Sequence, residues 1–365
     1  MPIPVGKRQL GAALLTAMLT VTLVATFAAA ALWQQWRATE VEGAERARVQ
    51  SGWILIGALD WSRLILREDA RANAVTGGAD HLAEPWAIPL AEAKLTSFLA
   101  ADKNIASDAL EGLPDAFLSG RIVDAQSKLN VMNLVEGGKP VTSAVEAFTK
   151  LFALLGLPAQ EVPLMVSNLQ KALPATVSVP ATAGTTGTTG STGATPVTPV
   201  PTTTTTTTTT METDTSTSAT GPLVPQHTAQ LVWLGLSPTT TAALEPYVTV
   251  LPVGGTKLNI NTASAEAIYA SVPKLDLASA KRLVERRARS YFRSLADATA
   301  LVQQNTAQFS EGQHSISTSY FDVHARLRLQ SAWVDEHTLL QRNGIEVRIV
   351  WRERGAGATE VPPKS

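Results

Sequence analysis

The chain has 365 residues, of which 30 are basic and 31 acidic, so its formal net charge at pH 7 is −1. A charge so close to zero provides no broad field that would attract nucleic acid or an anionic membrane surface. The chain has no cysteine, which excludes a disulfide framework and catalysis by a thiolate. Its length suffices for one large or two small hydrophobic cores.

The first 33 residues carry the strongest signal in the chain. A short basic leader ends at Lys7-Arg8-Gln9-Leu10-Gly11, and an uncharged apolar run follows from Ala12 to Trp33. A helix of about 20 residues crosses the hydrocarbon core of a bilayer, so this run is long enough to span a membrane. Because Lys7 and Arg8 precede the run, the positive-inside rule predicts a cytoplasmic leader and places the rest of the chain outside the cytoplasm.

Three kinds of N-terminal segment compete for this stretch. A secretory signal peptide has an apolar region of only about 7–15 residues, although the alanines at 28–31 offer a cleavage site. A plain signal anchor fits the length but gives no reason for Gly11 at the junction. A prepilin-type leader accounts for both the length of the run and the position of Gly11.

The next hundred residues change from helical to extended character. From Ala12 to about Arg71 there is no proline and apolar residues recur at helical spacing, which predicts one long helix, half in the membrane and half amphipathic. Turn residues follow at 73–78. Two prolines in the segment 84–90 predict extended chain. Residues 120–134 predict a β-hairpin that turns near 125–128.

Residues 142–173 return to helical periodicity, interrupted at Gly156-Leu157-Pro158, which predicts two helices with a tight connection. From Pro174 to about Pro222 the composition changes to threonine, glycine and proline around the run Thr202–Thr210. Such a tract has almost no apolar surface to offset the entropy of ordering it, so we expect a disordered loop. A tolerated insertion explains it more simply than an O-glycosylated segment does.

Residues 258–266 open a helix with Thr262 or Ser264 as its N-cap, 273–276 break that helix, and 277–289 form a second one. This order resembles the helix-hairpin-helix module of DNA-binding and competence proteins.

In DNA-binding members of that module, a Gly-hydrophobic-Gly turn brings backbone N–H groups against a phosphate. Here the turn is Lys274-Leu275-Asp276, which lacks both glycines and has a negative charge where the phosphate would lie. We therefore expect the module to be a scaffold, with a membrane-anchored DNA receptor as the alternative. The second helix is nevertheless basic, with Lys281, Arg282, Arg286, Arg287 and Arg289, a pattern that more often marks a solvated face.

The C-terminal region predicts strands. Residues 320–329 alternate apolar and polar side chains over much of their length, which is the period of a half-buried strand. Two more strands are predicted at 338–342 and 346–353, with Asn343-Gly344 as the hairpin turn between them. We expect an antiparallel meander.

The sequence contains no catalytic constellation, so we predict that the chain is not an enzyme. No two histidines have the spacing of a helical zinc motif, and neither a phosphate loop nor a Gly-x-Ser-x-Gly motif is present. The rival hypothesis is a periplasmic enzyme that signal peptidase releases, with a mature start near Leu32. The five histidines are His81, His227, His314, His324 and His337.

Taken in order, four features resemble the K-type minor pseudopilins of type II secretion, within the type IV pilin superfamily. The leader of that superfamily is cut after a glycine, here Gly11, so the mature chain would begin at Ala12 with Thr16 as its fifth residue. Most pilins have glutamate at the fifth position, where its carboxylate neutralises the amine of the subunit ahead. The K-type subunit lacks that glutamate. The segments 129–134, Leu-Asn-Val-Met-Asn-Leu, and 258–263, Leu-Asn-Ile-Asn-Thr-Ala, are also similar to K-type segments.

The resemblance implies an α+β fold in which a long, partly transmembrane N-terminal helix packs on an antiparallel pilin-like sheet. A large α-helical insertion would contain the helix-hairpin-helix-like or SAM-like unit. The expected segments are a prepilin leader (1–11), the transmembrane (12–33) and periplasmic (34–71) parts of the helix, the first part of the pilin-like domain (72–135), the insertion (136–312) with its disordered loop (174–222), the C-terminal strands (313–355) and a flexible tail (356–365).

It also implies a function. The chain would be a minor pseudopilin at the tip of the pseudopilus, nucleating or capping an assembly that exports folded proteins across the outer membrane. Prepilin peptidase would cut after Gly11, and Ala12 would be N-methylated. Expected partners are the I- and J-type minor pseudopilins, the major pseudopilin, prepilin peptidase and the inner-membrane secretion platform, but not nucleic acid. The chain would cross the bacterial inner membrane once, with its N-terminus in the cytoplasm and its bulk in the periplasm.

The resemblance leaves one cofactor open, because relatives bind calcium, and no other cofactor is expected. The sequence does not assign calcium ligands, and its scattered carboxylates are more often surface or capping groups. Five carboxylates are candidates: Glu68, Asp69, Asp80, Glu84 and Asp124.

Overall fold

The computed structural model describes residues 10–76, 78–96, 116–173, 221–302, 307–329 and 332–356. Most of the predicted leader, the threonine-rich tract up to residue 220 and the tail from residue 357 lie outside the described residues.

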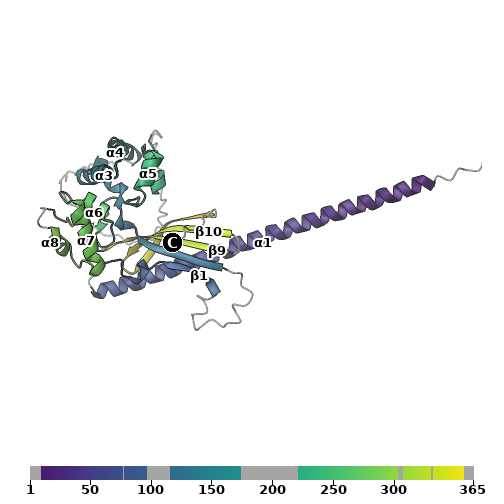
Figure 1. Cartoon of the computed structure of the whole chain (residues 1–365), viewed down its shortest axis with the longest axis horizontal. Coiled ribbons are helices and arrows are strands. Elements are labelled where there is room, and N and C mark those ends of the chain that lie inside the picture. Colours follow the sequence, from purple (N-terminus) through teal and green to yellow (C-terminus); the bar gives the residue numbers. More distant parts are fainter. Residues whose placement is uncertain are drawn as a thin grey trace, which may run out of the picture.

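A single helix, α1 (Leu10–Thr76), dominates the shape of the molecule. It has 67 residues, which corresponds to about 100 Å at 1.5 Å per residue. Its N-terminal half projects away from the rest of the chain, and its C-terminal half lies along the sheet (Figure 1). In the part of the chain that the structure describes, only this helix, within residues 13–74, is long and apolar enough to cross a membrane.

Among the described residues, five strands form one antiparallel sheet in the order β1-β2-β9-β10-β11. The predicted C-terminal meander is confirmed, because β9, β10 and β11 pair in sequence order. The first two strands precede the helical insertion in the chain, so β2 pairs with a strand about 200 residues further along. The strands are β1 (Leu90–Lys94), β2 (Ala116–Asp124), β9 (Tyr320–Leu329), β10 (Ala332–Asn343) and β11 (Glu346–Ala356).

The predicted hairpin near Asn343 is present, with its turn one residue further along. Asn343 pairs with Glu346, so the two-residue loop is Gly344-Ile345. Gly344 has a φ of 57°, and Ile345 is not among the residues with positive φ. This matches a type II′ turn, which requires positive φ only at its first central residue.

The core between α1 and the sheet follows from two periodicities. Leu59 and Leu66 lie on one face of the helix and pack against Phe321 and Val323, which alternate along β9. Trp86, 1% exposed, completes this cluster and contacts Phe321 edge-on at a ring-centroid distance of 5.2 Å.

The insertion between β2 and β9 forms a separate helical lobe with its own large core (Figure 1). The two predicted helices and their tight connection are confirmed, and Gly156 ends the first of them in the left-handed conformation. The lobe contains α3 (Thr142–Leu155), α4 (Glu161–Ala172), α5 (Pro238–Leu244), α6 (Ala265–Ser271), α7 (Leu277–Arg289) and α8 (Leu295–Val302). The whole is the α+β class that the sequence predicts.

Two local predictions are wrong. Residues 120–134 are not a hairpin: β2 ends at Asp124, and Leu129–Asn130 pairs in parallel with Val248–Thr249 of the insertion. The segment 84–90 is not extended throughout, because Pro85–Ala87 forms a 3₁₀ turn. Proline suits the first position of a helical turn, where its missing N–H is not needed.

Candidate assembly site

The projecting half of α1 is the most exposed structure in the chain. Every described side chain from residue 13 to residue 46 is exposed. Trp33 and Trp36 lie at the end of the apolar run with their ring centroids 5.4 Å apart, and paired aromatics of this kind are typical of a membrane–water interface.

The structure places the three predicted site residues near the start of this helix. Gly11 and Ala12 lie in the first turn of α1, which begins at Leu10. The Thr16 hydroxyl donates a hydrogen bond to the carbonyl of Ala13 at 2.9 Å. Cleavage after Gly11 and methylation of Ala12 stay predictions.

The apolar surface continues where α1 meets the first strand of the sheet. A hollow of about 680 Å³ lies between them, and its lining includes Trp53, Trp61, Ile88 and Leu90. These four side chains are between 40% and 70% exposed, so the surface is open to a partner.

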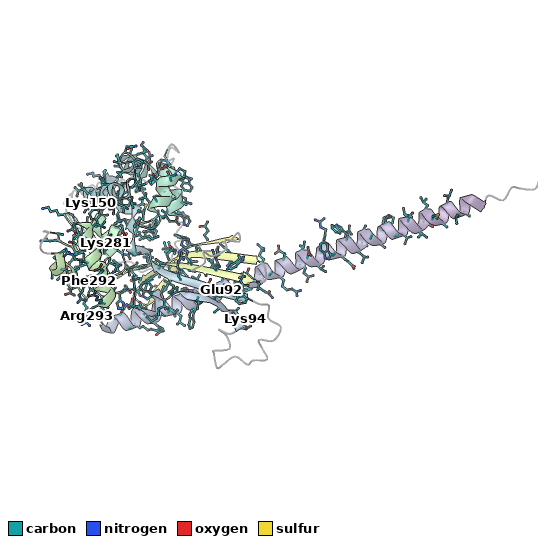
Figure 2. The ribbon with its side chains drawn as sticks, in the orientation of Figure 1. Glu92, Lys94, Lys150, Lys281, Phe292 and Arg293 are labelled. Carbon is teal, nitrogen blue, oxygen red and sulfur yellow. The ribbon has the colours of Figure 1, made fainter. Side chains whose placement is uncertain are left out.

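Charged residues lie on β1, the first strand of the sheet, beside this hollow. Figure 2 shows Glu92 and Lys94 on β1, close to the point where the projecting helix leaves the sheet. Glu92 pairs with Arg328 at 2.8 Å. Charges on an edge strand disfavour the addition of another strand, so the helix and the hollow are better docking surfaces than the edge itself.

A buried charge cluster attaches the C-terminal end of α1 to the sheet. Asp69 accepts a bond from Arg342 Nη1 at 2.6 Å, and Asp80 accepts one from Arg342 Nη2 at 2.5 Å. Glu84 lies in the same cluster, where it accepts bonds from the Trp86 indole at 2.7 Å and the Asn73 amide at 3.2 Å. Burial, reinforced by the charges of Glu84 and Asp80, raises the pKa of Asp69 to about 6 although Arg342 opposes the shift.

This cluster brings together three of the five candidate calcium carboxylates. Asp69 and Asp80 are each bonded to the Arg342 guanidinium. The guanidinium already neutralises these carboxylates, so the cluster does not fit a calcium ion. The remaining two lie elsewhere: Glu68 pairs with Arg71 on the surface, and Asp124 is buried at the junction with the insertion.

The segment 129–134 is a hydrogen-bonded clasp. The Asn130 side-chain oxygen accepts bonds from the N–H groups of Met132 at 3.1 Å and Leu251 at 3.0 Å. The Asn133 amide donates to the Thr256 carbonyl at 2.7 Å and accepts from the Thr256 N–H at 3.1 Å. Both asparagines therefore hold the start of the insertion against a segment more than 100 residues away.

The segment 258–263 closes a second clasp. Asn259 donates to Asp124 at 2.9 Å and to the carbonyl of Asp80 at 3.1 Å. Thr262 also donates to Asp124, at 2.5 Å, so of the two predicted N-caps only Ser264 performs that role. Asn261 exchanges two bonds with the backbone of Phe292. These polar residues fix the insertion to the sheet.

The helix-hairpin-helix turn lacks the features of a phosphate site. Lys274 takes the positive φ of 60° that glycine adopts more easily. The Asp276 carboxylate accepts the Ser279 N–H at 2.7 Å, so a side chain of this chain occupies the N-terminus of α7, where an anion would bind. Arg287 donates to the Ile260 carbonyl at 2.6 Å, and burial lowers its pKa to about 10. The structure thus uses part of the basic helix internally, as expected of a scaffold.

Sequence reasoning missed one cluster, Asp322, His324 and His337. Asp322 and His324 are two residues apart on one predicted strand, so the sequence indicates that they share a face of the sheet. Only the pairing of β9 with β10 brings His337 beside them.

Comparisons with known proteins identify a family. Two family models, each described as type II secretion system protein K, match residues 127–253 and 258–317, which together make up about half of the chain. These matches contain the segments 129–134 and 258–263 and most of the helical insertion.

Relatives match along nearly the whole length. The type II secretion system protein K of Pseudomonas aeruginosa is 25% identical over 360 residues, covering 98% of this chain and 96% of the relative. The protein of the same name from Pectobacterium carotovorum subsp. carotovorum is 24% identical over 364 residues, covering 98% of this chain and 99% of the relative. One solved structure is the GspK-GspI-GspJ complex from enterotoxigenic Escherichia coli. It contains a chain that is 16% identical to this one, with a TM-score of 0.49, and the match covers 87% of this chain and 99% of the chain in the complex. The family matches and these relatives show that the chain belongs to the type II secretion system protein K family.

Proposed function

We propose that this chain is a minor pseudopilin that occupies the tip of a type II secretion pseudopilus, where it nucleates or caps the assembly. The proposal depends above all on the projecting half of α1, which is exposed from residue 13 to residue 46 while the bulk of the chain lies at its other end (Figure 1). A helix that is apolar on all sides is buried in a membrane or against other helices.

The first step of the proposed mechanism is insertion and processing. The apolar part of α1 crosses the inner membrane with Lys7 and Arg8 on the cytoplasmic side, in keeping with the positive-inside rule. Prepilin peptidase then cuts after Gly11, and Ala12 is methylated as the new N-terminus. The globular part of the chain lies in the periplasm.

The second step is docking through the helix. The exposed apolar side chains of α1 continue into the hollow beside β1, lined by Trp53, Trp61, Ile88 and Leu90. A neighbouring subunit that packs its own apolar helix along this surface removes it from water, which stabilises the assembly in proportion to the area buried. Family membership supports the I- and J-type minor pseudopilins as these neighbours, with the major pseudopilin and the inner-membrane platform as further partners. The solved complex named above contains GspK together with GspI and GspJ.

The position at the tip is supported by Thr16 and by the insertion. Thr16 carries no charge, so it cannot neutralise the N-terminal amine of a subunit ahead of it as a glutamate does. The helical lobe widens the chain at the end opposite the membrane, where it would obstruct the addition of another subunit (Figure 1). Both features suit the first subunit of a stack, and its role there is structural, not enzymatic.

The N-terminal mass of the mature chain tests the leader, measured with and without prepilin peptidase. We expect a start at Ala12 that depends on the peptidase. A start near Leu32, or an intact Met1, would remove the leader hypothesis. Gly11→Leu should abolish both processing and secretion, and normal secretion by that variant would contradict the proposal.

A second experiment tests the position in the stack. Thr16→Glu should reduce secretion only mildly if no subunit lies ahead of this one. The matched change, replacing the fifth-position glutamate of the major pseudopilin by threonine, should be severe. Equal losses from the two variants would place this chain inside the stack.

A further inference from the structure

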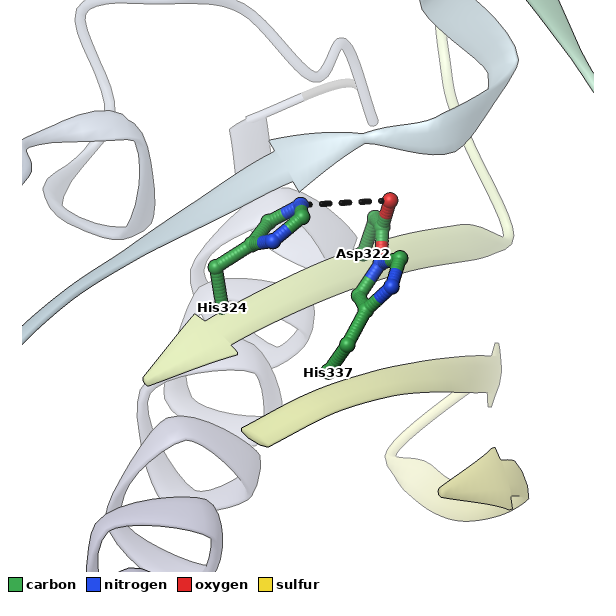
Figure 3. Close-up of side chains that lie close together, drawn as sticks. All are labelled: Asp322, His324 and His337. Carbon is green, nitrogen blue, oxygen red and sulfur yellow. Dashed lines mark hydrogen bonds and ion pairs between the residues drawn. The ribbon is translucent and has the colours of Figure 1, made fainter. Parts of the chain in front are cut away.

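We propose that Asp322, His324 and His337 form a binding site for a divalent transition-metal ion, with zinc as the reference ion. The three side chains lie on adjacent strands in the face of the sheet that points away from α1 (Figure 3). The site is independent of the proposed assembly function.

The register of the strands brings the ligands together. His324 of β9 and His337 of β10 are directly opposite each other, and Asp322 precedes His324 by two residues. Phe321 and Val323 pack against α1, so the alternation of the strand directs Asp322 and His324 to the other face. Two histidines and a carboxylate on paired strands are held by the backbone of the sheet, which is a rigid support for a site.

The donor atoms converge on one point. One carboxylate oxygen of Asp322 lies 3.4 Å from His324 Nε2, and the other contacts His337 Nε2. All three donor atoms lie within 4.8 Å of one another. Zinc binds imidazole nitrogen at about 2.0–2.1 Å and carboxylate oxygen at about 2.0–2.2 Å, so small side-chain rotations suffice to place one ion among them. The two rings are stacked with centroids 4.1 Å apart, which keeps both Nε2 atoms beside the same carboxylate.

The site is open to an ion from solution. The side chains of His324 and His337 are each 35% exposed and that of Asp322 is 24% exposed. A hollow of about 540 Å³, lined by both histidines, Arg121 and Glu353 among others, adjoins them. It has room for a water molecule as a fourth ligand.

The donor chemistry selects the class of ion. Imidazole nitrogens suit zinc, copper and nickel, whereas calcium and magnesium require oxygen ligands. Arg121 is opposite His324, and Lys128 acts electrostatically on Asp322, so nearby cations oppose the binding of a hard cation through charge alone. Binding therefore depends on the two nitrogen donors, and we expect no site for calcium here.

Trp351 and His227 form the adjacent wall without belonging to the site. The Trp351 ring meets His337 edge-on at 4.8 Å and meets His227 at 4.4 Å. His227 instead lies 3.6 Å from Glu353. This histidine, close by but directed at another partner, offers a matched control for substitutions.

Cobalt(II) titration of the purified, tag-free full-length chain in detergent tests the site, because cobalt substitutes for zinc and absorbs visible light when coordinated. We expect absorption bands that saturate at one ion per chain and disappear when zinc is added. Zinc at a hundredfold excess over its Kd should raise the unfolding midpoint by about 5–10 °C. A wild-type chain with no cobalt bands overturns the proposal.

Substitutions identify the ligands. His324→Asn and His337→Asn should each lower the affinity for cobalt at least tenfold, and Asp322→Asn should lower it as well, while His227→Asn leaves it within twofold. Full-strength bands in the double variant of His324 and His337, or an equal loss in His227→Asn, contradict the assignment. If the histidine variants fail to fold, X-ray absorption spectroscopy of the zinc-loaded wild-type chain tests the site. The spectrum should show two imidazole ligands, and fewer than two would overturn the proposal.

Discussion

The Asp69 carboxylate at the end of α1 lies 2.6 Å from Arg342 Nη1 on β10, and both side chains are less than one-tenth exposed. The same guanidinium reaches Asp80 and the carbonyl of Thr318, and it lies over the Phe321 ring at 4.6 Å. One arginine thus joins the long helix, the loop that follows it and the central strands of the sheet.

Removing this arginine should destabilise the chain strongly. Arg342→Met leaves Asp69 and Asp80 buried without their cation, which should lower the free energy of unfolding by about 3–5 kcal/mol. Urea unfolding of the full chain in detergent measures the change. Arg348→Met is the control, because Arg348 is 72% exposed and pairs with the exposed Glu346, and it should cost less than about 1 kcal/mol. Similar losses in the two variants would show that the buried cluster contributes no more than a surface pair.

The contact between α1 and the sheet should depend on one face of the helix. Leu66 is fully buried among Leu59, Trp86 and Phe321, so Leu66→Ala should lower the free energy of unfolding by about 2–5 kcal/mol through lost contacts and a residual cavity. Leu64 lies two residues earlier and is 41% exposed, and Leu64→Ala should change stability by about 0.5 kcal/mol or less. Thermal or urea unfolding compares the pair. Equal effects would contradict the observed orientation of the helix.

The clasp at Asp124 should be sensitive to the loss of a single hydroxyl. Burial raises the pKa of Asp124 to about 6, while the bond from Thr262 opposes that rise. Thr262→Val removes this donor with little change of shape and should cost about 1.5–3 kcal/mol, as is typical of bonds to charged groups. Thr149→Val is the control, because its exposed hydroxyl bonds only to the Val145 carbonyl in the same helix. A Thr262 variant as stable as the control would show that Asp124 does not need this donor.

His314 should contribute a loss of stability in mild acid. Burial lowers the pKa of His314 to about 4, whereas an unfolded histidine has a pKa near 6.5. The unfolded chain therefore binds the proton first, and the stability present above pH 6.5 is lost as the pH falls toward 4. Between pH 7 and pH 5 the loss should be about 2 kcal/mol.

A variant without the imidazole isolates this effect. Asp69 and Asp124 have raised pKa values of about 6, so they favour the folded chain as the pH falls and offset the loss from His314. The informative quantity is the difference between wild type and His314→Asn in urea unfolding at pH 7, 6 and 5. The two curves should converge as the pH falls, and parallel curves would show that His314 does not govern the acid response.

The features predicted correctly are those encoded by neighbouring residues. The apolar run after Gly11 and the absence of proline specify α1, the Gly156 signal separates α3 from α4, and Gly344 places the β10–β11 turn. Each depends on local backbone preferences or on a short periodicity, which are present in a single stretch of chain.

The errors occurred where distant segments compete with local preference. Residues 120–134 have the alternation of a hairpin, but Leu129 and Asn130 pair with Val248 and Thr249 instead. The hydrogen bonds of Asn259 were also not predicted, because its partners Asp80 and Asp124 are both more than 130 residues away. No local pattern contains such partners.

The sequence by itself determined the long apolar N-terminal helix and most of the order of helices and strands, because these depend on hydrophobic length, periodicity and turn residues. Only the tertiary structure decided that Arg342 neutralises Asp69 and Asp80, that paired asparagines fasten the insertion, and that His324 and His337 meet beside Asp322. Those relationships depend on the register between strands that are far apart in the chain. That register is set by which face of each strand is buried, and not by the polar residues that it brings together.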